Sequence, residues 1–348
     1  SLRMMGDVAE FYVNNSIRNH YFVSISGYHI AEAGANPITQ AALTLANGLT
    51  YVELFKARGL DPDQFLRNFS WFFSNGMDPE YVVIGRVARR IWSIAMREMY
   101  NVGERGQKLK YHIQSSGRSL HAQEYTWNDY RTTLQALYAL ADNANSLHTN
   151  SRDEAFGTPT EETVRDAVAI QLILSKEYGL LQNENPLQGS HITTWLTENV
   201  EAQILKIFEE MNRRGGVLGS LEVNYQRNRI QDESMVYEHK KHTGDIPIVG
   251  VNTFQDPDSK NLSADEADSF NLDVTRSDSN EKKMVILRNE EFKTRYAKEA
   301  EMGIERLKNT AREGGNLFEV MMDIVDYCTV GQVTEALFET GGQFRRNM

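Results

Sequence analysis

The sequence is poor in several features that would assign it to a particular class of protein. Its 348 residues include one cysteine, Cys328, which excludes an internal disulfide framework and a cysteine cage around zinc or an iron–sulfur cluster. A reducing, cytoplasmic setting is the simplest interpretation. No run of about 18 apolar residues occurs, so no membrane-spanning helix is expected. Acidic residues outnumber basic ones by 48 to 37, which argues against a nonspecific nucleic-acid-binding protein.

Short motifs of nucleotide and hydrolase sites are also missing. The sequence has no Gly-x-x-x-x-Gly-Lys-[Ser/Thr] phosphate loop, no Gly-x-Ser-x-Gly nucleophile elbow and no Gly-x-Gly-x-x-Gly after a predicted strand. His239 and His242 have a spacing that suits metal binding. The two lysines between them and the lack of a third ligand in the motif favour a solvated helix end instead. We therefore expect no metal ligands in this chain.

What the first half does contain is one pattern, repeated four times. A short apolar or β-branched run is followed by a polar cluster and then by a long amphipathic stretch. The predicted strands are Val23–Gly27, Phe69–Phe73, Leu109–Ser115 and Ala144–His148. The predicted helices are Pro37–Arg58, Pro79 to about Tyr100, Asn128–Ala141 and Thr160–Tyr178. This alternation predicts an α/β fold of parallel βα units, in a barrel or in an open sheet.

The second half has a different rhythm. The sequence predicts helices at Thr194–Arg214, Ser220–Glu238, Glu290–Arg312 and Leu317 to about Gly342, and a strand at Ile246–Phe254. Residues 255–282 hold eight acids without apolar periodicity, which indicates a solvated loop. Cys328 lies in an apolar pattern and is expected to be buried. The predicted division is 1–180 for the βα units, 181–254 for a helical extension with a short strand, 255–282 for the loop and 283–348 for a helical tail.

Polar side chains gather where the predicted strands end. Tyr28 and His29 follow the first strand, and a histidine there can donate a hydrogen bond or carry a proton. His112 and Gln114 are two residues apart on the third strand, so they share one face of the sheet. A satisfied polar pair inside a barrel is the alternative for these two residues. Further polar candidates lie near the second and fourth strands: Asn68, Ser70, Asn145, His148, Asn150 and Glu154. For the residues near the fourth strand the alternative is ordinary turn chemistry. For Asn68, Ser70 and the aromatic run of Trp71, Phe72 and Phe73 the alternative is a place in the core.

Several of these segments, in the same order, resemble the signature of the adenosylcobalamin-dependent acyl-CoA mutases, the methylmalonyl-CoA mutase family. They are Ser24–Gly34 (SISGYHIAEAG), Tyr111–Gln123 (YHIQSSGRSLHAQ), Arg131–Ala136 (RTTLQA), Ser146–Glu154 (SLHTNSRDE), Pro159–Glu162 (PTEE) and Asn185–Ser190 (NPLQGS). Tyr237–His242 before Val249–Phe254, and the ending after Gly342, are similar to the fused isobutyryl-CoA mutase branch. Asn68 and Arg118 depart from methylmalonyl-CoA mutases, which often have Arg and Trp there.

The resemblance implies a (β/α)8 TIM barrel with the acyl-CoA threaded along its axis. This chain supplies four βα units and a helical tail, so it would be the C-terminal half of the barrel. The first four units are expected before Ser1. A cobalamin-binding domain, which ligates the cobalt outside this chain, and a G-protein domain are expected upstream or on another chain. A homodimer is expected, and the isolated chain is expected to be inactive.

The resemblance also implies a role for each candidate residue. His29 and Tyr28 would be catalytic, with His29 hydrogen-bonded to the thioester oxygen and Tyr28 between the substrate and the corrin. The residues implied to contact the acyl-CoA are His112, Gln114, Ser70, Asn68 and Asn145. The residues implied to face adenosylcobalamin are Glu32, Gly117, Asn150 and Glu154.

The implied activity is a radical isomerisation of isobutyryl-CoA to n-butyryl-CoA. Three alternatives remain open at this point. Methylmalonyl-CoA or another branched acyl-CoA could be the substrate. A half barrel could serve only in assembly, without catalysis. An unrelated barrel lyase could use His29 and Glu32 for acid–base chemistry without cobalamin.

Overall fold

A computed structural model describes residues 2–17, 20–179, 182–183, 185–257 and 277–343. The chain divides into two compact units. One comprises residues 1–22, 54–65 and 276–348, and the other comprises residues 23–53 and 66–275. The four-part division expected from the sequence stays a prediction. Among the described residues, no helix combines the length and the apolar character needed to cross a membrane.

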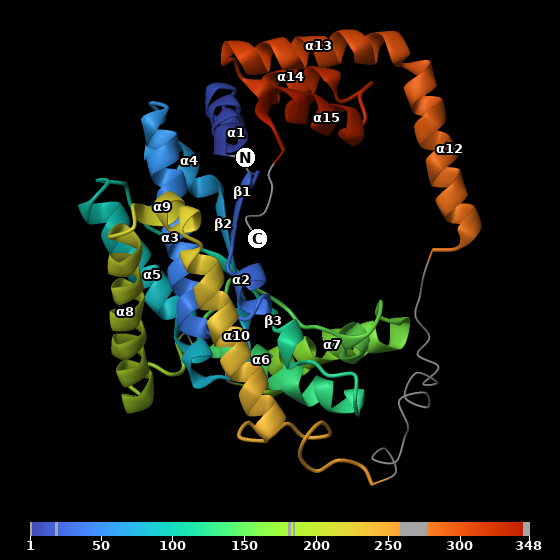
Figure 1. Ribbon diagram of the computed structural model, residues 1–348. Coiled ribbons are helices and arrows are strands. Elements are labelled where there is room, and N and C mark those ends of the chain that lie inside the picture. The colour runs from blue at the N-terminus through green and yellow to red at the C-terminus, as the bar shows by residue number, and fades with distance from the viewer. Residues whose placement is uncertain (1, 18–19, 180–181, 184, 258–276, 344–348) are drawn as a thin grey trace. The chain divides into compact units, whose positions relative to one another are not determined.

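The second unit is built on a parallel sheet of four strands in the order β1-β2-β3-β4 (Figure 1). The strands are β1 (Val23–Ser26), β2 (Phe69–Asn75), β3 (Tyr111–Ser115) and β4 (Ser146–His148). The helices that follow them are α3 (Pro37–Ala57), α5 (Ile84–Glu98), α6 (Asn128–Ala141) and α7 (Glu161–Leu172). The predicted α/β fold with four parallel βα units is therefore confirmed.

Shorter helical elements decorate the ends of these strands and helices. They are α2 (Tyr28–Glu32), the 3-10 helices η1 (Leu66–Asn68), η2 (Pro79–Val82), η3 (Gly117–Ser119), η4 (Tyr125–Trp127) and η5 (Arg152–Ala155), and the π-helix η6 (Ile173–Glu177). Helix α5 begins at Ile84 rather than at the predicted Pro79. The buried carboxylate of Asp142 accepts hydrogen bonds from Gly85 N at 2.5 Å and Arg86 N at 3.0 Å, and so caps the helix from another element.

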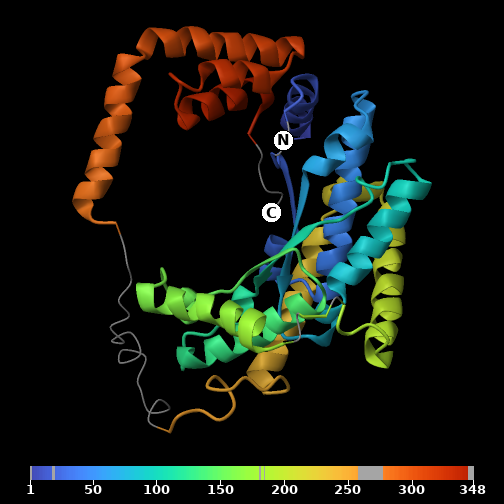
Figure 2. The ribbon, with the colours of Figure 1, turned by 180° about the vertical axis from the view of Figure 1, so that it is seen from behind.

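The sheet has one buried face and one open face. Side chains alternate along a strand, so every second residue points to the same side. Ile25, Trp71, Phe73 and Ile113 are at most 2 % exposed and belong to the buried face. Helices α3 and α5 lie on one side of the strands, with α8 outside them (Figure 2). At alternate positions of β2 and β3, Ser70, Phe72, His112 and Gln114 are partly exposed, and they form the open face.

Three further helices complete the second unit: α8 (His191–Asn212), α9 (Gly216–Glu222) and α10 (Tyr225–Thr243). Helix α8 buries a stripe at spacings of three and four residues, as an amphipathic helix does: Leu196, Val200, Ile204, Ile207 and Met211. The predicted helix Ser220–Glu238 is two helices, because Asn224 adopts a left-handed conformation with φ of 55°.

The predicted strand at Ile246–Phe254 is wrong. The structure has only an isolated bridge between Val249 and Thr253 there. The side chain of Asn252 takes the place of a partner strand, because its Oδ1 accepts from Ile248 N at 2.6 Å and its Nδ2 donates to Ile246 O at 2.9 Å. Such local hydrogen bonds from an asparagine favour a turn over a ladder.

The first unit is helical. Its elements are α1 (Leu2–Asn14), α4 (Pro62–Phe65), α12 (Ser279–Arg295), α13 (Ala297–Glu313), α14 (Leu317–Ile324) and α15 (Val330–Gly341). Its core holds Leu307, Ile324 and Cys328, so the predicted burial of Cys328 is confirmed, although this residue lies between α14 and α15. Residues 279–282 were predicted as loop. They are helical because Asp278 and Glu281 form a capping box. The rest of the predicted loop lies largely outside the described residues.

Candidate functional site

The turn after β1 places Tyr28 and His29 directly at the carboxyl end of the sheet. Gly27 N donates to Phe72 O at 2.7 Å, which extends the pairing of β1 with β2 by one residue. A Cβ on Gly27 would lie 2.3 Å from Thr44 Oγ1 and 2.9 Å from Gln40 Cγ, so only glycine fits against helix α3. Helix α2 therefore starts close to the sheet, and Tyr28 and His29 stand over its edge.

A row of rings crosses the open face. The Tyr28 ring stacks on Phe72 with centroids 5.1 Å apart and planes at 11°, and Phe72 lies 5.0 Å from the His112 ring. The sequence treated Phe72 with Trp71 and Phe73 as core. Strand alternation places Phe72 on the same face as Ser70, and this signal could have assigned Phe72 to the open face. His29 is exposed beside this row, with its ring 5.6 Å from that of Tyr28.

The hydroxyl of Tyr28 is a protonated group at neutral pH. Burial, together with the carboxylates of Glu32 and Glu154, raises the pKa of Tyr28 above its usual value. Gln114 Nε2 donates to this hydroxyl at 3.2 Å and to Asn150 Oδ1 at 3.0 Å. Gln114 thus joins Tyr28 and Asn150, from the carboxyl ends of β1 and β4, for which the family resemblance implied a catalytic and a cofactor-binding role.

Glu32 and Gly117 are also brought together. Glu32 Oε1 accepts from Gly117 N at 3.0 Å, from Ser116 Oγ at 3.1 Å and from Ser74 Oγ at 3.3 Å. A Cβ on Gly117 would lie 2.9 Å from Glu32 Oε2. The carboxylate is therefore fixed by two serines that the sequence did not single out as ligands of Glu32.

Asn150 is fully buried, and its polar atoms are used within the protein. Its backbone N donates to Ser115 Oγ at 2.9 Å, and its Nδ2 donates to Ser115 O at 2.8 Å. The carboxylate of Glu154, four residues later in η5, belongs to an exposed residue. Asn150 is thus placed to hold Gln114, whereas Glu154 is available to a bound molecule.

His112 lies farther along the open face, toward the amino end of β3. Its Nδ1 is 2.8 Å from Ser146 Oγ on the neighbouring strand. Burial and the neighbouring His148 lower the pKa of His112, so its imidazole is neutral at neutral pH. Ser70 is in register with Ser24 at the same level of β1 and β2.

Asn68 and Asn145 lie at the opposite, amino ends of the strands. Asn68 is buried at the end of η1, just before β2. Asn145 Oδ1 accepts from Tyr111 N at 2.9 Å, so the side chain replaces a ladder bond and β4 starts only at Ser146. Asn145 lines a cavity of about 520 Å³ with four basic residues: Arg86, Arg89, Lys108 and Lys110. The eleven predicted site residues therefore fall into a group at the carboxyl ends and on the open face, and a pair at the amino ends.

A comparison with known protein families shows which family this chain belongs to. The methylmalonyl-CoA mutase family model matches residues 1–343. The chain belongs to the methylmalonyl-CoA mutase family. The family resemblance inferred from the sequence motifs is therefore confirmed.

Relatives of this mutase-family chain differ in their named substrates. It is 60 % identical over 348 residues to the fused isobutyryl-CoA mutase of Geobacillus kaustophilus, covering 100 % of the chain and 32 % of that protein. It is 31 % identical to the 2-hydroxyisobutanoyl-CoA mutase large subunit of Aquincola tertiaricarbonis, covering 99 % of the chain and 60 % of that subunit. It is 32 % identical to the methylmalonyl-CoA mutase of Escherichia coli, covering 97 % of the chain and 46 % of that protein. The chain spans about a third of the length of the fused relatives.

A second cavity of about 1030 Å³ is lined by residues that follow β1, β2 and β3 and by residues of α10. The Arg118 guanidinium stands over the Tyr237 ring at 4.7 Å, so the position that departs from methylmalonyl-CoA mutases contacts α10. His121 also lines this cavity, and burial together with the positive charges of Arg131 and Lys241 lowers its pKa to about 4. The sequence did not single out His121.

Proposed function

We propose that this chain is the C-terminal half of the barrel of an adenosylcobalamin-dependent acyl-CoA mutase that converts isobutyryl-CoA to n-butyryl-CoA. The observation that carries the proposal is the open face itself, where Tyr28, Phe72 and His112 form a row beside His29. The 60 % identity to a fused isobutyryl-CoA mutase supports this substrate over the methylmalonyl alternative.

The sheet topology supports the half-barrel proposal. In the described part of the chain, β1 and β4 each pair with one strand, on one side only. Exposed strand edges favour association with further strands, and closure into a barrel removes them. The other four βα units of the proposed barrel would also cover the open face, where polar and aromatic side chains are partly exposed.

The residues around Gly117 fit the flat, amide-rimmed body of adenosylcobalamin. Gly117 carries no side chain, and the hydroxyl of Tyr28 lies 3.7 Å from where its Cβ would be. Ser26 Oγ is buried and has no hydrogen-bond partner among the described residues. Glu32 and Glu154 offer carboxylate oxygens at the rim of this surface, which suit ribose hydroxyls and amides. These residues would hold the cofactor, and its cobalt–carbon bond would supply the radical chemistry.

The chain's own residues would position the substrate and exclude water. His29 would donate a hydrogen bond to the thioester oxygen, an electrostatic contribution of about 3–4 kcal/mol when such a donor is fixed in place. The Tyr28 and Phe72 rings would shield the reacting centre, and the phenol would stay protonated because its pKa is raised. Gln114 and neutral His112 would contact the acyl-CoA along the open face.

The amino ends of the strands suit the rest of the substrate. Coenzyme A is anionic, and the cavity beside Asn145 holds four basic side chains. Asn68 and Ser70 would line the path between this end and the reacting centre. The cobalamin-binding and G-protein domains would lie outside this chain, the enzyme would be a homodimer, and the single cysteine supports a cytoplasmic location.

The test uses the full-length enzyme that contains this chain. Absorbance during titration with adenosylcobalamin reports cofactor binding, and chromatography reports the isomerisation of isobutyryl-CoA. We expect saturable binding and turnover of isobutyryl-CoA well above that of methylmalonyl-CoA or 2-hydroxyisobutanoyl-CoA. A preference for either of those substrates would reject the substrate assignment. Tight cofactor binding by residues 1–348 alone would contradict the half-barrel proposal, and no binding by the full enzyme would leave the assembly or lyase alternatives.

A further inference from the structure

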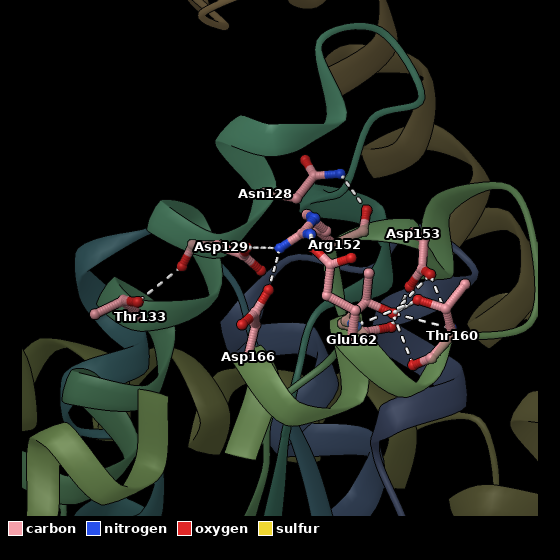
Figure 3. Close-up of polar contacts among 10 residues, drawn as sticks. Asn128, Asp129, Thr133, Arg152, Asp153, Thr160, Glu162 and Asp166 are labelled. Carbon is pink, nitrogen blue, oxygen red and sulfur yellow. Dashed lines mark hydrogen bonds and ion pairs between the residues drawn. The ribbon is translucent and has the colours of Figure 1, made fainter. Parts of the chain in front are cut away.

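The loop after β4 contains an arginine whose side chain is directed into the supporting helices (Figure 3). Arg152 Nη1 contacts Asp129 Oδ2 of α6 at 3.0 Å and also the carboxylate of Asp166 on α7, and its Nη2 contacts Glu162 Oε1 at 2.8 Å. The Arg152 side chain is 17 % exposed. One guanidinium therefore ties the loop to two different helices.

Asp153, the next residue, ties the same loop to the start of α7. Its Oδ2 accepts from Thr163 Oγ1 at 2.7 Å and from Thr160 N at 3.1 Å, and its Oδ1 accepts from Ser151 Oγ at 2.6 Å. Burial favours the protonated acid, but the hydrogen bonds from Ser151 and Thr163 prevail and hold the pKa of Asp153 below its usual value. Asp153 therefore remains a charged anchor at neutral pH.

The main chain of the loop is held as well. Asn128 Nδ2 donates to Arg152 O at 2.9 Å and to His121 O at 2.8 Å. Asn128 is fully buried, so these hydrogen bonds are shielded from water. The loop is thus fixed through both its side chains and its backbone.

The two residues that flank this pair are predicted to serve the cofactor. Asn150 lies two residues before Arg152 and Glu154 two residues after it. We propose that Arg152 is a positioning residue that, with Asp153, fixes this loop so that Glu154 keeps its place toward adenosylcobalamin and Asn150 keeps its hydrogen bond to Gln114. The inference rests on the proposed function for its ligand, and it adds a residue for which the sequence motifs implied no role.

The charges explain why arginine is needed. Three carboxylates surround one guanidinium, so removing it leaves like charges close together. Burial and the nearby Asp166 already raise the pKa of Asp129, even though the Arg152 guanidinium works in the opposite direction. The planar fork of arginine contacts carboxylates on both helices at once, whereas lysine offers a single ammonium. The Glu162 side chain is 78 % exposed, so its contact contributes little.

The test compares Arg152→Met, Arg152→Lys and the control Arg213→Met in the full-length enzyme. Arg213 pairs with Glu209 on the surface, with exposures of 75 % and 69 %. Hydrogen exchange measures the mobility of residues 148–156, and optical titration gives the Kd for adenosylcobalamin. We expect Arg152→Met to raise exchange in this segment and to raise the Kd roughly 10- to 100-fold, the scale of a small misplacement of binding groups. The KM for acyl-CoA should stay within about twofold, Arg152→Lys should be intermediate and Arg213→Met should match the unmodified enzyme.

Each outcome separates the inference from the proposed function. Unchanged exchange in residues 148–156 would overturn the positioning role, whatever the ligand is. A lower melting temperature with an unchanged Kd would reduce Arg152 to a structural role and also overturn the inference. If the unmodified enzyme binds no adenosylcobalamin, the proposed function fails, while the exchange data still decide whether Arg152 positions the loop. If Arg152→Met does not fold, Arg152→Lys and Asp166→Asn provide the same two measurements.

Discussion

The carboxyl ends of β1 and β4 contribute to the same candidate site, but they are fixed in different ways. At β1, Tyr28 is held by ring stacking on Phe72 and by a neutral hydrogen bond from Gln114, and Gly27 permits a close approach to α3. At β4, the loop is held by the ion pairs of Arg152 and by the hydrogen bonds that the charged side chain of Asp153 accepts.

This difference indicates which part of the candidate site depends on side-chain packing and which part depends on charge. Packing and neutral hydrogen bonds are sensitive to added volume and insensitive to salt. Ion pairs at partly exposed positions weaken with ionic strength. The β1 end should therefore respond to small steric changes, and the β4 end to changes in charge or salt. The proposed cofactor contacts at the two ends can then be perturbed separately.

The largest effect is expected at the β1 end, for His29→Ala. Removing the donor that we propose for the thioester oxygen should lower turnover by about 10²–10³-fold, while the affinity for adenosylcobalamin stays unchanged. Steady-state kinetics and optical titration of the full-length enzyme measure the two quantities. His239→Ala, at an exposed position of α10, is the matched control. Unchanged turnover in His29→Ala would remove His29 from the mechanism.

A smaller effect is expected for Gly27→Ala, which adds one methyl group at the β1 end. The new Cβ would meet Thr44 Oγ1 and Gln40 Cγ, both on fully buried residues, so the neighbours have little room to move. Overpacking of this kind costs about 1–3 kcal/mol in the free energy of unfolding. Urea denaturation monitored by circular dichroism measures the loss. Gly179→Ala, where an added Cβ meets nothing within 4 Å, should be neutral, and equal stability of the two variants would contradict the steric argument.

A pH dependence is expected from His112, which lies between the two ends. Burial and His148 lower the pKa of His112 in the folded protein, so the unfolded chain binds a proton more readily. The stability that this group contributes is therefore present above about pH 6.5, the ordinary histidine value, and is lost as the pH falls below it. Melting temperatures between pH 7.5 and 5 should fall less steeply in His112→Gln than in the unmodified protein. His239→Gln serves as the exposed control, and parallel pH profiles for His112→Gln and the unmodified protein would reject this assignment.

The sequence predicted the βα units well because their signal is local. Alternation along the strands and the three-to-four spacing in α3 and α8 are read within one element. The errors came from side-chain hydrogen bonds, two of them between distant parts of the chain and one within a single loop. Asp142 shifts the start of α5, the side chain of Asn252 replaces the expected strand, and Asn145 shortens β4. None of these hydrogen bonds follows from the periodicity of the segment that it changes.

The candidate site was predictable for a similar reason. The motifs after each strand named the residues, and parallel strands bring their carboxyl ends to one edge. The motifs did not indicate which residues support others. Ser74, Ser116 and Arg152 act on Glu32 or on the β4 loop through side chains that the sequence gives no reason to pair. The position of Phe72 on the open face was available from strand alternation and was outweighed by its apolar neighbours.

The smallest effect, and the most direct test of the comparison, is that of salt. Raising NaCl from 0.1 M to 1 M shortens the Debye length from about 10 Å to about 3 Å. Hydrogen exchange in residues 150–155 should then rise severalfold, because the Arg152 pairs with Asp166 and Glu162 are partly exposed. Exchange in Tyr28–Glu32 should not change, because no ion pair was found for these residues within the described part of the chain. In Arg152→Met the salt effect on residues 150–155 should disappear, and an equal response of both segments would show that charge does not distinguish the two ends of the site.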